Sequence, residues 1–142
     1  MFSAAVQIVE NFKAVEKAVA DASFRNISHA AASLRKDAVG SIEPGEGPST
    51  PGTPPHTHTQ KITKKGKTRK GVYPRAIAFV VDKAKEEAII GPQFSKVGES
   101  FHAHEFGESF HGESFPERPT MGPALDRAAP RFGDSFAGSL GG

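Results

Sequence analysis

Histidine and acidic side chains gather in the second half of the chain, where their spacing raises the question of metal binding. Residues 102–105 read His-Ala-His-Glu, and His56 and His58 form a second pair. Alternate residues of an extended segment share one face, so either pair would be able to chelate zinc. The metalloprotease arrangement His-Glu-x-x-His is absent. We therefore expect no metal and favour structural hydrogen bonds for His104 and Glu105 at the end of an element.

Nucleophilic and phosphate-binding motifs are also missing. The chain has no Cys, which excludes disulfides, thiolate zinc sites and Cys nucleophiles. It contains no Gly-x-Ser-x-Gly elbow and no phosphate-binding loop, and Gly45-Glu46-Gly47 neither follows a strand nor opens a helix. We expect no catalytic residues and no cofactor, and hence that the protein is not an enzyme.

A basic cluster precedes the predicted sheet and contains no acidic residue. Three roles remain open: lining a channel for double-stranded DNA without reading its sequence, gripping an acidic face of a neighbouring subunit, or forming a solvated loop. The members of the cluster are Lys61, Lys64, Lys65, Lys67, Arg69, Lys70 and Arg75.

An acidic cluster follows between residues 99 and 117, which hold no Lys or Arg. In a closed ring each subunit presents two different faces, so the two clusters can meet at every interface, and this favours the subunit contact. Arg118, between two prolines, is suited to a carboxylate contact with Glu105 or with Glu117 of a neighbouring subunit. The acidic candidates are Glu99, Glu105, Glu108 and Glu113.

The first 42 residues carry the spacing of amphipathic helices. Apolar residues recur at steps of three and four over residues 2–20 and again over 24–42. Because Asp21 and Ser23 are suitable N-caps, we favour two helices with a break near Asp21, the alternative being one long bent helix. The apolar positions of the first helix are Phe2, Val6, Val9, Phe12, Val15 and Val19.

The remaining chain predicts a small sheet with more helix. Residues 43–75, rich in Pro and Gly at first and basic later, are expected to form an extended loop or arm. Residues 75–82 and 87–91 predict an antiparallel hairpin, 99–106 a short helix and 110–115 a strand. A last helix opens near Met121, and Pro130 is expected to break or kink it. The fold class is α+β, with N-terminal helices and a C-terminal helix packed on a small antiparallel sheet.

Length and composition limit what this fold can be. The 142 residues suit one domain, 1–142, divided into a helical region at 1–42, the segment 43–75 and a remainder at 76–142. Only 30 residues are Val, Ile, Leu or Phe, so a single copy has a thin core and is expected to bury surface against other copies. A net charge of +2 is too near neutral to imply nucleic-acid binding. No apolar run reaches the roughly 18 residues of a membrane span, so we expect a soluble, intracellularly made protein.

Several short motifs, taken in order, resemble a known family. The motifs are Pro51-Gly52-Thr53-Pro54-Pro55-His56-Thr57, Val80-Val81-Asp82-Lys83, Ile89-Ile90-Gly91-Pro92, His104-Glu105-Phe106-Gly107, Phe115-Pro116-Glu117-Arg118-Pro119 and Met121-Gly122-Pro123-Ala124-Leu125. With these motifs the chain resembles the tail completion, or head–tail joining, proteins of tailed bacteriophages over about residues 24–129, although Thr120 stands where that family has a bulky apolar residue.

The resemblance implies a structural virion protein without a catalytic centre. Such a subunit forms a ring, with six copies favoured, at the phage neck or the head-proximal end of the tail. It joins the head connector or stopper protein to the tail tube protein, and double-stranded DNA passes through the ring. The protein would be assembled in the host cytoplasm, with no membrane partner. The alternative hypothesis is a small basic nucleic-acid-binding protein, although only Tyr73 and Phe79 offer stacking aromatics near the basic cluster.

Overall fold

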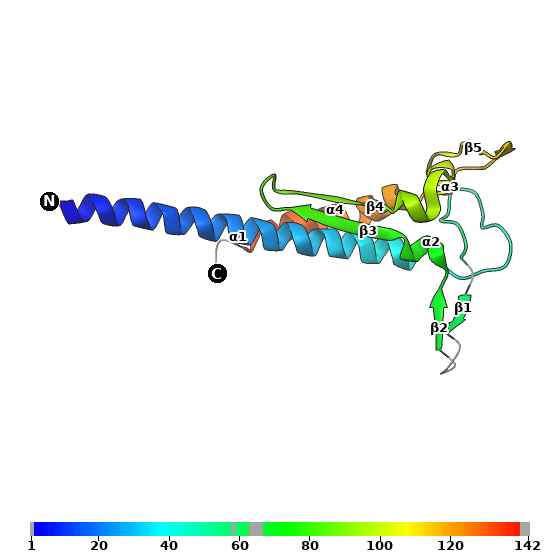
Figure 1. Ribbon diagram of the computed structural model, residues 1–142, viewed down its shortest axis with the longest axis horizontal. Coiled ribbons are helices and arrows are strands. Elements are labelled where there is room, and N and C mark those ends of the chain that lie inside the picture. The colour runs from blue at the N-terminus through cyan, green and yellow to red at the C-terminus, as the bar shows by residue number, and fades with distance from the viewer. Residues whose placement is uncertain (1, 58, 63–66, 140–142) are drawn as a thin grey trace.

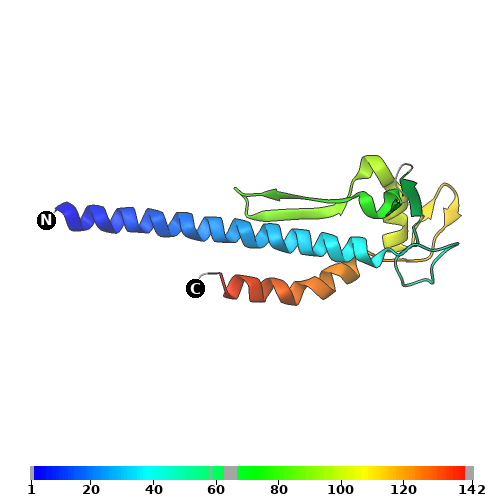
Figure 2. The same ribbon diagram turned by 90° about the horizontal axis from the view of Figure 1, so that it is seen from below.

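The fold is built along one long helix, α1 (Phe2–Ser41). The computed structural model describes residues 2–57, 59–62 and 67–139, and the side chains of 12–57 and 71–139. The hairpin of β3 (Ile77–Asp82) and β4 (Glu87–Pro92) lies on one side of α1, and α4 (Met121–Ala137) lies on another (Figures 1 and 2). This arrangement confirms the predicted α+β class.

The predicted break near Asp21 is wrong, because α1 runs through it for 40 residues. No Gly or Pro occurs between residues 2 and 39, so nothing in the backbone interrupts the helix there. Asp21 instead binds Lys83 at the tip of the β3–β4 hairpin, Oδ1 to Nζ 3.0 Å. The Asp21 side chain, predicted to cap a second helix, therefore makes a tertiary contact within a continuous helix.

Three separate antiparallel hairpins make up the strands of the described chain. The predicted β3–β4 pair is confirmed, with Phe79 opposite Ile90. The strand predicted at 110–115 is a tight hairpin of β5 (Ser109–Phe110) and β6 (Glu113–Ser114).

The segment 43–75 is an irregular loop only as far as residue 57. Beyond it lie β1 (Thr59–Ile62) and β2 (Lys67–Lys70), which pair antiparallel, and the single turn α2 (Val72–Arg75). The expectation of continuous loop was wrong for these residues. Alternation of Thr, Gln, Lys and Ile is weak as a strand signal, and pairing across a turn supplies what local propensity lacks.

The last two helices extend beyond their predicted bounds. α3 (Phe94–Phe106) begins before Gly98, whose φ of 50° and ψ of −141° mark a kink, and ends at Gly107 with φ 69°. Gly107 thus occupies the left-handed conformation that commonly ends a helix and that glycine adopts without steric cost. α4 continues past Pro130, so of the predicted break or kink at this residue the break does not occur. Pro130 is exposed, and the carbonyl that it leaves unpaired four residues earlier can bind water.

The core is small and lies where α1, β3, α3 and α4 meet. Ala38, Ala124 and Ala128 have no exposed surface, and these small side chains let α1 and α4 approach closely. The buried cluster consists of Leu34, Ala38, Ile42, Ile77, Phe101, Ala124 and Ala128.

Candidate functional site

The N-terminal section of α1 projects beyond the rest of the molecule (Figure 1). All side chains from residue 12 to residue 20 are exposed, including Phe12 at 67%, Val15 at 60% and Val19 at 43%. The tip of the β3–β4 hairpin reaches α1 only near Asp21 and Phe24. There Lys83 Nζ binds Asp21 and lies over the ring of Phe24, 5.4 Å from the ring centroid. We call residues 12–20 the arm.

The arm carries an apolar stripe, and no element among the described residues of its own chain covers this stripe. Phe12, Val15 and Val19 are spaced at three and four residues and so lie on one face of the helix. Isolated helices of this length are marginal in water, and most helical stability comes from packing of such a face. The arm therefore has the chemistry of a contact surface.

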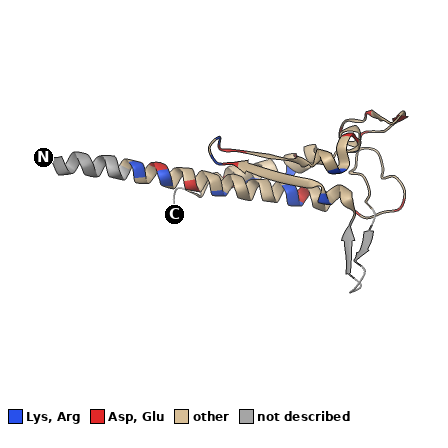
Figure 3. Ribbon diagram, in the orientation of Figure 1, with Lys and Arg blue, Asp and Glu red and all other residues tan. Residues whose placement is uncertain are grey.

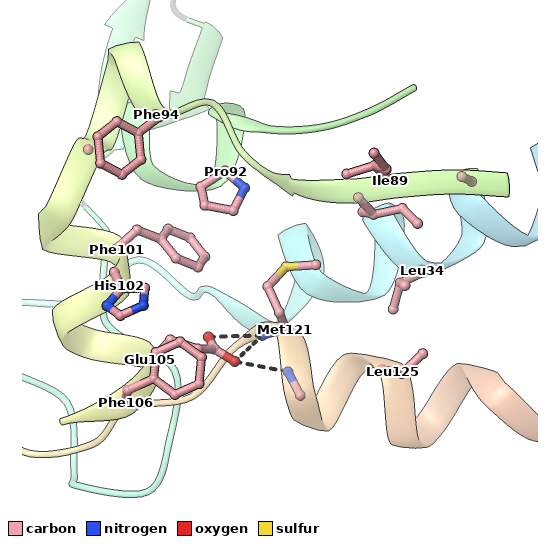
Figure 4. A pocket seen from close by; sticks show the side chains of 14 residues that line it. Leu34, Ile89, Pro92, Phe94, Phe101, His102, Glu105, Phe106, Met121 and Leu125 are labelled. Carbon is pink, nitrogen blue, oxygen red and sulfur yellow. Dashed lines mark hydrogen bonds between the residues drawn. The ribbon is translucent and has the colours of Figure 1, made fainter. Parts of the chain in front are cut away.

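An apolar groove of about 690 Å³ lies nearer the other end of the molecule. Figure 4 shows β4 and α4 as its two walls, α1 with Leu34 behind them, and α3 closing one end. Much of the lining is open to solvent, since Ile89 is 65%, Phe94 67%, Phe106 62% and Leu125 49% exposed. Other lining residues are Leu34, Pro92, Phe101, His102 and Met121.

Glu105 fixes the wall that α4 contributes. Its carboxylate accepts hydrogen bonds from the backbone N–H groups of Thr120 (2.7 Å), Met121 (3.0 Å) and Gly122 (2.9 Å), drawn as dashed lines in Figure 4 where both residues are shown. These donors open α4, where a negative charge also complements the helix dipole. Because Glu105 is only 9% exposed, its structural role is confirmed and it is removed from the predicted subunit-interface set.

Arg118 is likewise turned inward. It is 7% exposed, and its Nε donates to the carbonyl of Ser49 at 3.0 Å. Its backbone N–H donates to the carbonyl of His104 at 2.6 Å. The expected contact with Glu105 or with a neighbour's carboxylate is therefore wrong, because this guanidinium ties the Pro/Gly-rich loop to the body of the same chain.

The two histidines of the His-Ala-His-Glu sequence have different surroundings, because they lie on a helix and not on the extended segment that chelation requires. His102 Nδ1 is 2.8 Å from Glu108 Oε2 at the surface. His104 packs between Tyr73 (5.9 Å between centroids) and Phe115 (5.0 Å). No group of three potential metal ligands occurs among the described residues.

Burial governs the titration of this aromatic cluster. It lowers the pKa of His104, with a further contribution from the nearby Arg118. It raises the pKa of Tyr73 to about 12, where the ring stacks on Phe101 with centroids 5.2 Å apart. Both side chains are thus held neutral near pH 7, as suits packing more than acid–base chemistry.

The predicted charged clusters lie on hairpins at the same end of the molecule. β1–β2, from the basic cluster, and β5–β6, from the acidic one, project from the body in different directions (Figure 1). Glu99, Glu108 and Glu113 are exposed, and acidic positions, red in Figure 3, recur along the β5–β6 hairpin. Arg75 is exposed and donates from Nε to the carbonyl of Gly71 at 3.0 Å. Lys64 and Lys65 lie outside the described residues, as do the side chains of Lys61, Lys67, Arg69 and Lys70.

Sequence reasoning missed the groove. Of the two phenylalanines of α3 that follow Gly98, Phe106 is largely exposed and Phe101 is buried. The available signal was the run of apolar residues on both sides of the kink at Gly98, which turns Phe94 and Phe106 toward one opening. No periodicity assigns these residues to one surface, because they come from different turns of an irregular helix.

Comparisons add no relative to this picture: no protein-family model, curated protein or solved structure matches the chain. Among the described helices, none has a stretch both long enough and apolar enough to cross a membrane.

Proposed function

We propose that this protein is a structural subunit of a tailed-bacteriophage virion that assembles with copies of itself into a ring. The ring, with six copies favoured, lies at the neck or the head-proximal end of the tail. It contacts the head connector or stopper protein on one side and the tail tube protein on the other. Double-stranded DNA passes through its centre without sequence readout.

The observation that carries the proposal is the uncovered arm. A helix that presents Phe12, Val15 and Val19 to water is incomplete as a single molecule, and exposed apolar surface of this kind is typical of contact sites. A second copy supplies burial without any further partner, as in many virion proteins built from one repeated subunit.

The family-like motifs give separate support. His104–Gly107 and Met121–Leu125 lie apart in sequence but are joined by the hydrogen bonds that Glu105 accepts from the start of α4. The order of these motifs, which carries the resemblance, thus corresponds to one structural unit of this chain.

Opposite charges on the two projecting hairpins favour a head-to-tail contact. The basic β1–β2 and acidic β5–β6 segments project from the body in different directions, so they would meet on adjacent subunits and not within one. Such pairing orients subunits and is screened by salt.

Measuring the native mass and imaging the purified chain by electron microscopy test this function. We expect a closed ring whose population falls as salt is raised from about 0.05 to 1 M, where the Debye length shrinks to about 3 Å. The ring should join purified tail tubes. A monomer that binds DNA tightly in a gel shift at moderate salt would instead support the nucleic-acid-binding alternative.

A further inference from the structure

We propose that the groove between β4 and α4 of one subunit binds the arm of a neighbouring copy, with Phe12, Val15 and Val19 as the inserted side chains. This inference rests on the proposed self-assembly and names the surfaces that carry it. The groove is lined by Leu34, Ile89, Phe94, Phe106, Met121 and Leu125.

The shapes of the two surfaces suit each other. Figure 4 shows an elongated opening with a strand and a helix as walls. An amphipathic helix inserts into such a groove through side chains at positions i, i+3 and i+7, and Phe12, Val15 and Val19 have this spacing. Both surfaces are apolar and exposed in the single chain, so docking would remove both from water at once.

The arm cannot fill the groove of its own chain. α1 is one uninterrupted helix from Phe2 to Ser41, so the arm cannot fold back. Val15 and Leu34 are 19 residues apart on this helix, a separation of about 28 Å at 1.5 Å per residue. The occupant must therefore come from another molecule, and a second copy always provides the matching helix.

The charged side chains of the arm leave its apolar face free. Lys13 and Lys17 lie on the side of the helix away from Phe12, Val15 and Val19, so both can remain in water when that face is buried. The contact is therefore carried by the removal of apolar surface from water.

The contact is heterologous, since arm and groove are different surfaces. Such a contact closes into a ring when the rotation between copies permits it. A reciprocal exchange of arms between two copies is the dimeric form of the same contact. The inference concerns which surfaces meet and holds for either assembly.

Cross-linking between single-cysteine variants tests the contact, and the absence of native Cys makes each label unique. Val15→Cys and Leu125→Cys chains with different tags are mixed, allowed to exchange, and treated with a short bismaleimide reagent that tolerates a small offset in register. Control pairs replace one partner by Lys17→Cys, on the opposite face of the arm, or by Glu46→Cys, exposed in the Pro/Gly-rich loop and not among the lining residues.

We expect the Val15–Leu125 product to exceed both control products at least fivefold. Equal yields from an assembled protein would overturn the inference while leaving the proposed ring intact. A protein that stays monomeric would overturn both. An apolar dye that binds the assembled native protein as well as a Val15→Asp variant would show a groove left open to small molecules, which also contradicts arm docking.

Discussion

The two sections of α1 share one sequence pattern and differ in what covers them. In the C-terminal section, Ala31, Leu34 and Ala38 are at most 5% exposed beneath β3–β4 and α4. In the arm, Phe12 and Val15 repeat the same spacing and remain at least 60% exposed. Periodicity thus specifies an apolar face, whereas tertiary structure decides whether its partner lies in the same chain. We assign the C-terminal section to folding and the arm to assembly.

Truncation of the buried residue that directly follows the covered section of α1 should give the largest loss of folding stability. Ile42 has no exposed surface and belongs to the buried cluster, so Ile42→Ala should lower the free energy of unfolding by about 2–5 kcal/mol. Val15→Ala, in the arm, should change it by less than about 0.5 kcal/mol. Denaturant unfolding at concentrations where the chain is monomeric measures both. Similar losses would erase the distinction between the two sections.

Removing the Glu105 carboxylate, which binds the first N–H groups of α4, should weaken the helix that covers the C-terminal section of α1. Glu105→Ala leaves the N–H groups of Thr120, Met121 and Gly122 without their acceptor, so we expect a loss of about 2–3 kcal/mol in unfolding free energy. Glu99→Ala, at an exposed position of α3, is the control and should be nearly neutral. Equal effects would indicate that Glu105 does not hold the helix start.

A charge on the arm should separate assembly from folding. Val15→Asp should weaken self-association at least tenfold, about 1.4 kcal/mol, because the carboxylate would be buried against apolar side chains. Ala14→Asp introduces the same charge on another face of the arm and should have a smaller effect. Analytical ultracentrifugation measures association, and circular dichroism checks that helix content is unchanged. Equal weakening by both variants would argue for charge alone.

The sequence predicted local features well and their long-range partners poorly. The β3–β4 hairpin and the opening of the last helix follow from the alternation of apolar residues and from the tolerance of Pro123 in a first helical turn, which act over a few residues. Asp21, a suitable cap by residue type, instead binds Lys83, which is 62 positions away. In the same way, Glu105 is buried because it binds the start of α4, and Arg118 is buried because it binds the loop at Ser49. The sign of a side chain's charge cannot by itself distinguish a surface contact from an internal one.

The smallest predicted effect is a pH dependence confined to the folded body. Burial lowers the pKa of His104, so the unfolded chain binds a proton more readily than the folded chain. Stability should therefore fall as pH decreases below about 6.5, the unfolded value, and level off below the folded pKa. His104→Phe, which keeps the aromatic contacts, should flatten this dependence, whereas exposed His102→Gln should not. The two variants behaving alike would contradict the assignment.

Hydrogen exchange measured as a function of protein concentration tests the central claim most directly, because it reports on both sections of α1 in the unmodified chain. We predict that backbone amides of residues 12–20 are protected when the protein is assembled and become exposed to exchange on dilution to monomer, while those of residues 31–38 stay protected at both concentrations. Arm amides that are equally protected in the monomer, or unprotected at every concentration, would contradict the assignment of the arm to assembly.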